Sequence, residues 1–196
     1  MPRRCIPPSV RLLATLLIVG IVAGPLAAQS SPARPFGTLR EQAARQQRWL
    51  ETRMETVLPA LMRKYGVDMW VIPMREYNED PTFTSLVSPT TFAARRRTIY
   101  VFFDRGPEQG IERIALGGTS QGGVYEAVRT TRAVDSPVGG RTAELWGDQQ
   151  WLVLKDVLEA RNPKTIAVNM SRTFAFADGL TAGELEGMRA MLGEQW

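Results

Sequence analysis

Three carboxylate side chains lie close together in the segment Met74–Pro81, which reads MREYNEDP. They are Glu76, Glu79 and Asp80, and an arginine, a tyrosine and an asparagine accompany them. Carboxylates at this spacing could bind Mg²⁺, Mn²⁺ or Ca²⁺ through oxygen, or could act as a general acid and base. The segment follows the apolar run VDMWVIP, and open α/β folds bind ligands at the ends of strands. It is therefore the first candidate for a functional site.

The same segment also fits a solvated loop, in which Asn78 and Asp80 form turns and Pro81 fixes the backbone. It does not match the twelve-residue calcium loop. The chain has no histidine, so it lacks the usual base for a serine or cysteine nucleophile and the commonest ligand of transition metals. Its one cysteine, Cys5, precedes the apolar N-terminal run, and the usual zinc sites are excluded as well. Since charged loops are usually solvated, the pattern favours a polar loop over a complete catalytic centre.

Four other features can be interpreted either structurally or functionally. The glycine-rich segment 117–123 lacks the Gly-Lys-Ser/Thr ending of a phosphate-binding loop, which favours a turn after a strand. The run Arg95–Arg97 could bind an anion or an acidic partner, but charge runs are more typical of a solvated face. Asp104 is placed to cap a turn. Packing rather than ligand binding is expected for the tryptophans and strand phenylalanines, namely Trp49, Trp70, Trp146, Trp151, Phe102 and Phe103.

The elements that must position these residues follow from apolar periodicity. A helix is predicted from Thr38, which has capping-box spacing with Glu41, to a stop at Gly66. Pro59 should bend or divide it. Further helices are predicted at 148–161, with Asp148 as N-cap, and from Thr181, again with capping-box spacing to Glu184. Strands are predicted at 67–73, 97–104, 110–118 and 164–171, with a hairpin through 105–109.

A hairpin followed by a helical crossover predicts an α/β fold with a mixed β-sheet and flanking helices. The apolar content of the 196-residue chain, 44%, suits one such domain. We expect the domain to occupy residues 38–196, preceded by a linker at 29–37 that is rich in proline and small residues.

Residues 1–28 have a basic start, an apolar run and small residues at 28–30, which is typical of a cleaved secretory signal. An uncleaved membrane anchor is the less favoured alternative, because the apolar run is short for a span. The segment holds three of the 24 basic residues and no acidic ones, which leaves the remaining chain close to neutral. No nucleic-acid partner is expected. An exported chain without further cysteine fits the bacterial periplasm.

Several ordered segments together resemble a known family. They read RMETVLPALMRKYGVDMWVIPMREYNEDPTF, ARRRTIYVFFDRG, NPKTIAVN and FAFADGLTAGELEGM, and the likeness extends from about Arg40 to Trp196. These segments resemble the N-terminal, creatinase-like domain of bacterial M24 family metallopeptidases, the Xaa-Pro aminopeptidase or prolidase-like proteins. The resemblance implies a ribonuclease H-like α/β domain with a mixed sheet.

In that family a larger pita-bread catalytic domain follows and supplies two aspartates, one histidine and two glutamates to a pair of divalent metal ions (Mn, Zn or Co). The metals activate a water. The resemblance assigns none of these ligands to this chain, so no catalytic or metal-binding residue is expected here and the chain should be inactive alone. It implies that the N-terminal domain narrows access for proline-containing peptides and supports a homodimer. It places Arg75, Glu76, Tyr77 and Asn78 on the substrate side of the cleft.

Three hypotheses follow. The first is the non-catalytic N-terminal domain of an exported Xaa-Pro aminopeptidase-like enzyme, whose catalytic domain is its partner. The second is a stand-alone periplasmic binding or interaction module without enzymatic activity, and the coding sequence beyond codon 196 distinguishes the two. The third is a carboxylate-dependent hydrolase that uses Glu76, Glu79 and Asp80. A domain without its catalytic partner should expose apolar surface, which we expect near 75–81 and the C-terminal helix.

Overall fold

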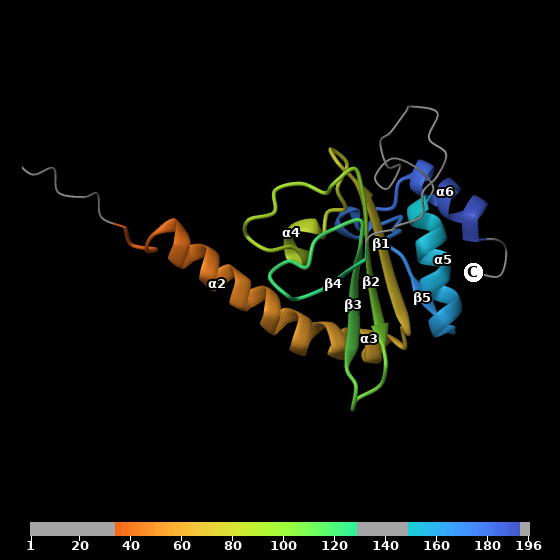
Figure 1. Ribbon diagram of the computed structural model, residues 1–196, viewed down its shortest axis with the longest axis horizontal. Helices are drawn as coiled ribbons and strands as arrows, with labels where there is room; N and C mark the ends of the chain where they lie inside the picture. Colours follow the sequence, from red (N-terminus) through yellow and green to blue (C-terminus); the bar gives the residue numbers. More distant parts are fainter. Residues whose placement is uncertain (1–33, 129–148, 193–196) are drawn as a thin grey trace, which may run out of the picture. The chain divides into compact units, whose positions relative to one another are not determined.

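A mixed β-sheet with the strand order β4-β3-β2-β1-β5 organises the computed structural model, which describes residues 34–128 and 149–192 (Figure 1). Strands β1, β2 and β3 are antiparallel neighbours, while β5 pairs parallel to β1 and β4 parallel to β3. All five strands belong to the unit that begins at Thr38, and residues 34–37 belong to a separate unit. The strands are β1 (Met69–Arg75), β2 (Arg97–Asp104), β3 (Ile111–Leu116), β4 (Glu126–Val128) and β5 (Ile166–Ala167).

Strands β1 and β2 are buried on both faces of the sheet. Side chains alternate along a strand, so Ile72, Tyr100 and Phe102 enter one apolar cluster while Val71 and Val101 enter the other. A strand covered on both faces reads as a continuous apolar run, as VDMWVIP and YVFF do. The predicted α/β class with a mixed sheet and flanking helices is therefore confirmed.

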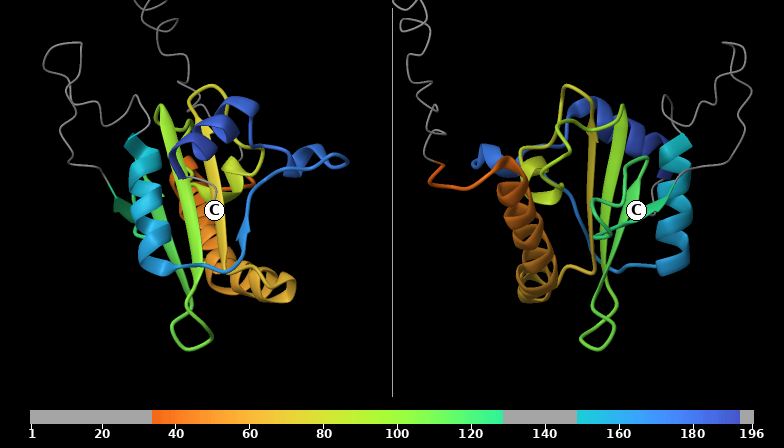
Figure 2. Two further views of the ribbon diagram at one scale, coloured as in Figure 1. Left: turned by 90° about the vertical axis from the view of Figure 1, so that its right-hand side faces the viewer. Right: turned by 60° about the vertical axis from the view of Figure 1, so that its left-hand side comes forward.

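One face is covered by a long, divided helix (Figure 2). It comprises α2 (Leu39–Thr52), the π-helical turn η1 (Arg53–Val57) and α3 (Leu58–Tyr65). The predicted capping box of Thr38 and Glu41 opens α2, and Gly66, at φ 64°, ends α3. Pro59 divides the helix as predicted. It lies in the first turn of α3, where a missing N–H costs little, and the π turn before it is closed by a bond from the N–H of Leu58 to the carbonyl of Arg53.

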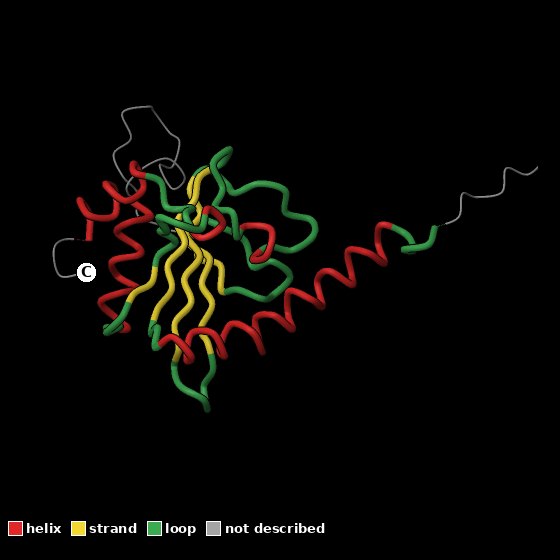
Figure 3. The backbone as a smooth tube through the Cα atoms, turned by 180° about the vertical axis from the view of Figure 1, so that it is seen from behind, coloured by secondary structure: helices red, strands yellow, loops and turns green. Residues whose placement is uncertain are grey.

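The opposite face carries α5 (Gln149–Arg161) and α6 (Ala182–Leu192), as the tube in Figure 3 also shows. Trp151, Leu154 and Leu158 of α5 are fully buried in the second cluster. Gly187 brings α6 close to this helix, because a Cβ added at Gly187 would lie 2.8 Å from Nε1 of Trp151. The glycine therefore sets how closely α6 approaches α5.

Asp104 caps a turn, as predicted, and also joins the β2–β3 hairpin to α3. Its Oδ1 accepts a bond of 2.9 Å from the N–H of Gly106, and its carboxylate pairs with Arg63 at 2.8 and 3.0 Å. The bond from Arg63 lowers the pKa of Asp104 below its usual value. The hairpin is thereby fixed to the end of the divided helix.

Some elements differ from the sequence expectations. The strand predicted at 164–171 shortens to Ile166–Ala167, because Asn169 turns away to bond with side chains of other segments. The strand β4, the short helix α4 (Phe83–Leu86) and the 3₁₀ turn η3 (Ala175–Ala177) had no sequence prediction. Trp49 was predicted to pack, which is wrong: it is 58% exposed, because its neighbour Leu50 takes the position that faces the sheet.

The predicted signal segment (1–28), the first part of the linker, Trp146 and Asp148 lie outside the described residues. Within residues 34–128 and 149–192 no helix combines the length and apolarity that crossing a membrane requires.

Replacing Gly187 by alanine tests the close approach of α6. Overpacking a buried contact costs about 1–3 kcal/mol, and the gain in helix propensity, about 1 kcal/mol, offsets part of it. We expect Gly187→Ala to lower the free energy of unfolding by about 1 kcal/mol in urea denaturation. Gly183→Ala is the matched control in the same helix. Its Cβ would meet only the Arg75 guanidinium at 4.0 Å, so stability should hold or rise. Equal effects of both changes would contradict the assignment.

The pair of Arg161 and Glu112 fixes the end of α5 to β3 through two bonds of 2.6 Å. The bond from Arg161 lowers the pKa of Glu112 in the folded protein. The ion pair therefore stabilises the fold above the pKa that Glu112 has in the unfolded chain, and this stabilisation is lost as pH falls through the lower pKa of the folded protein. We expect Glu112→Gln to cost about 1 kcal/mol of unfolding free energy at neutral pH. The difference from wild type should shrink as pH falls through the acid range. Urea unfolding at pH 7 and in acid, with Glu108→Gln as an exposed control, measures this; a pH-independent difference would refute it.

Candidate functional site

A tight turn follows β1 and displays one aromatic side chain. The backbone N–H of Arg75 donates to the carbonyl of Asn78 at 3.4 Å, and the N–H of Asn78 donates back to Arg75 at 3.0 Å. Tyr77 lies between them at φ 67°, a conformation that is uncommon for a residue with a side chain. Its side chain is 93% exposed. Because backbone conformations of this kind cluster at functional sites, the turn is a candidate site.

Asp80 is a buried connector rather than a solvated loop residue. Only 2% of it is exposed, and its carboxylate accepts two bonds from Nδ2 of Asn169, at 3.0 and 2.9 Å. The backbone N–H and the hydroxyl of Thr82 donate to it as well, at 2.8 and 2.6 Å. Asn169 in turn accepts a bond of 2.8 Å from the indole N–H of Trp70. The expectation of a solvated loop is wrong at this position, because the buried carboxylate ties its own turn to Asn169, 89 positions away in the sequence.

The three carboxylates do not converge on one point. Glu79 accepts a bond of 3.0 Å from the N–H of Ala94, whereas Glu76 uses its backbone N–H on the carbonyl of Arg96 and keeps a partly exposed side chain. Among the residues that the structure describes, no three histidine, cysteine, aspartate or glutamate side chains form a group that could hold a metal ion. The bonding of Asp80 argues against the carboxylate hydrolase, since its oxygens face Asn169 and Thr82.

A second carboxylate, Glu184 of α6, lies between two arginines. Its Oε1 is 3.0 Å from Nε of Arg75, and its Oε2 is 2.9 Å from Nε of Arg97, whose second nitrogen also donates to Oε1 at 3.0 Å. Only 3% of the Glu184 side chain is exposed. The guanidinium of Arg97 also lies 4.9 Å from the ring centre of Trp151. The solvated face predicted for Arg95–Arg97 is therefore wrong at Arg97, which is an internal ion-pair partner.

The sequence pattern missed the role of Glu184. Its spacing from Thr181 predicts a capping box, and the N–H of Glu184 does donate to the Thr181 hydroxyl at 3.4 Å. The carboxylate, however, is bonded by the arginines. Nothing local to α6 indicates this, because both arginines come from the sheet.

The glycine-rich segment forms a turn, as predicted, around a buried glutamine. Gln121 is 3% exposed at φ 51°. Its Oε1 accepts bonds of 2.8 Å from the N–H of Ser88 and the hydroxyl of Thr91, and its Nε2 donates to the hydroxyl of Tyr100 at 3.3 Å. Burial raises the pKa of Tyr100 to about 12. The sequence signal for this buried hydrogen-bonding role was that Gln121 is the one long polar side chain in the glycine-rich segment.

Exposed aromatic residues also occur outside the turn of Tyr77. Phe92 is 89% exposed, and Phe174 and Phe176 are 63% and 51% exposed with their ring centres 6.3 Å apart. The two phenylalanines belong to a loop whose base is closed by a bond from the N–H of Leu180 to the carbonyl of Asn169. We call residues 170–179 the Phe loop. Gly179 packs against Asp80, so the buried carboxylate also supports this loop.

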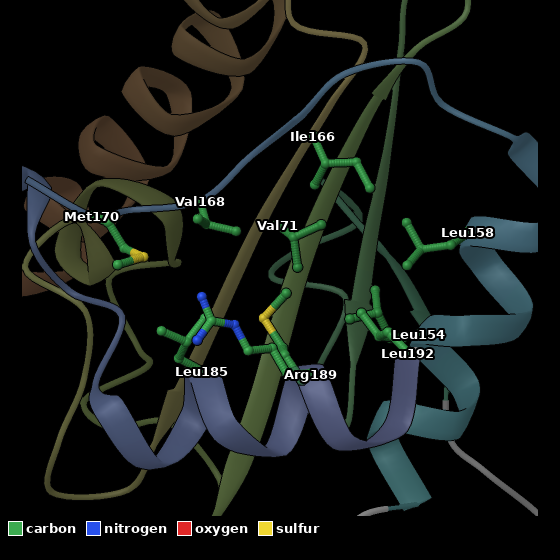
Figure 4. A pocket seen from close by; sticks show the side chains of 10 residues that line it. Val71, Leu154, Leu158, Ile166, Val168, Met170, Leu185, Arg189 and Leu192 are labelled. Atoms are coloured by element: carbon green, nitrogen blue, oxygen red, sulfur yellow. The ribbon is translucent and has the colours of Figure 1, made fainter. Parts of the chain in front are cut away.

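An apolar pocket lies on the face of the sheet that carries α5 and α6, between β1, β5 and these two helices (Figure 4). We call it the α5–α6 pocket. Its volume is about 280 Å³, and Arg189 is the one charged residue in its lining. It was not predicted from sequence, because its walls come from four elements.

Comparison of the sequence with protein-family models and curated proteins, and of the fold with solved structures, finds no match. The chemistry of the site is therefore assigned from its own residues.

Removing the carboxylate of Glu184 tests the link between α6 and the sheet. Breaking a buried ion pair by removing one partner costs about 3–5 kcal/mol, and the exposure of Arg75 should keep the effect near the lower end. We expect Glu184→Gln to lower the unfolding free energy by about 3 kcal/mol. Glu186→Gln, at an exposed position of the same helix, should change it by less than about 0.5 kcal/mol. Comparable losses in the two variants, measured in urea, would show that Glu184 has no special role.

Proposed function

We propose that residues 38–196 form the non-catalytic, creatinase-like N-terminal domain of an exported Xaa-Pro aminopeptidase-like metallopeptidase. In this proposal the domain shapes substrate access and supports dimerisation for a catalytic domain that carries the divalent metal ions. The mixed sheet with helices on both faces is compatible with the ribonuclease H-like fold of that family. Residues 1–28 would direct export to the periplasm.

The observation that carries the proposal is the preorganised turn after β1. Its backbone is closed on itself between Arg75 and Asn78, and the Arg75 side chain is held by Glu184. Tyr77 stands exposed between them. A contact residue that is already held in place loses less conformational freedom when it binds. The turn therefore has the properties of a preorganised surface for contacting a peptide.

The four residues proposed for the substrate side have different roles. Tyr77 and Asn78 are exposed and would contact a proline-containing peptide directly. Glu76 is partly exposed beside them. Arg75 is engaged with Glu184, so it would position the turn rather than bind the peptide.

Exposed apolar side chains support a docking role. Phe92, Phe174 and Phe176 are each more than half exposed, and the rings of Phe174 and Phe176 lie next to each other; exposed apolar surface often marks contact sites. In the proposal these side chains would face the catalytic domain or a second subunit, and the peptide would reach the metal ions of that domain past Tyr77.

A second function is favoured by the Phe loop, whose two rings are held out by a closed base. It is a stand-alone periplasmic binding module without enzymatic activity. The coding sequence beyond codon 196 separates the two. A continuing frame that encodes the two aspartates, one histidine and two glutamates supports the peptidase domain, and an intact unrelated gene there supports the module.

Peptidase assays test the proposal at the level of activity. Protein lacking residues 1–28 should release no N-terminal residue from Xaa-Pro peptides with or without Mn²⁺ or Zn²⁺. When the catalytic domain is supplied, Tyr77→Ala should raise KM for these peptides about tenfold with little change in kcat, because it removes contact rather than chemistry. Glu108→Gln, at an exposed turn, is the matched control. Metal-dependent turnover by the isolated protein, or kinetics unchanged by Tyr77→Ala, would overturn the assignment.

A further inference from the structure

The α5–α6 pocket is graded from an apolar floor to a charged rim. Val71, Leu154 and Leu158 form its floor and are fully buried, whereas Met170 at the rim is 53% exposed. Arg189 is exposed on α6. Figure 4 shows its guanidinium directed back along the helix beside Leu185, toward the side on which Met170 lies. The remaining lining residues are apolar, namely Ile166, Val168, Leu185, Met188 and Leu192.

Arg189 differs from the arginines that stabilise the fold. Arg63, Arg75, Arg97 and Arg161 each pair with a carboxylate. In the described part of the chain no ion pair involves Arg189. A guanidinium presents planar, paired donors that match a carboxylate, so the pocket offers one end for an apolar group and one for an anion.

We propose that the α5–α6 pocket binds a medium-chain fatty acid, with the alkyl chain against the partly buried side chains of Ile166, Val168 and Met188 and the carboxylate on Arg189. A dry apolar cavity of about 150 Å³ is large enough for benzene. The volume here, about 280 Å³, thus suits a chain of roughly eight to ten carbons. The inference does not depend on the proposed peptidase function, because the pocket shares no residue with the turn of Tyr77.

The charge and the shape make separate demands on the ligand. Decanoate satisfies both, decanol satisfies the shape alone, and decylamine brings a cation to Arg189. We therefore expect decanoate to bind most tightly and decylamine about tenfold or more weakly. An aromatic side chain in place of Val168 would occupy the pocket and abolish binding of all three.

Isothermal titration of the purified protein with each compound, below its micelle concentration, tests the proposal. Arg189→Gln should weaken decanoate binding about tenfold and leave decanol unchanged. Arg172→Gln is the matched control, since this exposed arginine is outside the pocket lining. Methyl NMR should place the decanoate shifts on Met188 and Leu185. Because Arg189 is exposed, its replacement leaves the fold intact and decides the outcome even where Val168→Phe unfolds the protein.

Three results would overturn the proposal. The first is no binding of decanoate at concentrations below its micelle threshold. The second is equal affinity for decanoate and decylamine, or an affinity for decanoate that Arg189→Gln leaves unchanged. The third is a set of methyl shifts confined to Ala175 and Ala177, the neighbours of the exposed Phe174 and Phe176, which would indicate adsorption to apolar surface.

Discussion

The buried carboxylate of Glu184 is the interaction on which the arrangement of this domain depends. It joins β1 through Arg75, β2 through Arg97 and the last described helix, α6. Removing a carboxylate from water is costly, and two guanidinium groups with three short bonds offset that cost. Because Arg97 also lies over Trp151, α5 is included in the same group. The position of α6, and with it one wall of the apolar pocket, follows from this pairing.

Asp80 has a similar role at the neighbouring edge of the sheet. Through Asn169 it connects the segment after β1 with Trp70 and with the segment after β5. Gly179 packs directly on it, so the base of the Phe loop rests on a buried polar group. Asp80, which first suggested catalysis, thus supports the loop that displays Phe174 and Phe176, while Glu184 holds Arg75 in the turn that displays Tyr77. A domain built in this way is suited to presenting contacts, which is the role proposed for it.

Local signals predicted most of the secondary structure. Thr38 with Glu41, Pro59 and Gly66 each act within a turn or two of their own position, and the structure has the cap, division and end that they indicate. The apolar runs of β1, β2 and β3 were equally clear. The three-residue strand β4 carries no such pattern, since it is held by pairing with β3 rather than by its own composition. The prediction for β5 extended too far, because Thr165 and Val168 favour strands by residue type, whereas the bonds of Asn169 that end the strand come from distant segments.

The sequence by itself determined the class of fold, the limits of the main helices, and the lack of histidine that removes the commonest catalytic base. These features depend on residue type and short-range spacing, which can be read directly from the sequence. Only the tertiary structure decided which polar side chains are structural and which are exposed. Asp80 and Asn169 are 89 positions apart, and Arg97 and Glu184 are 87 apart. A hydrogen bond or ion pair requires contact within a few ångströms, and no local pattern states which distant residue the fold will bring there.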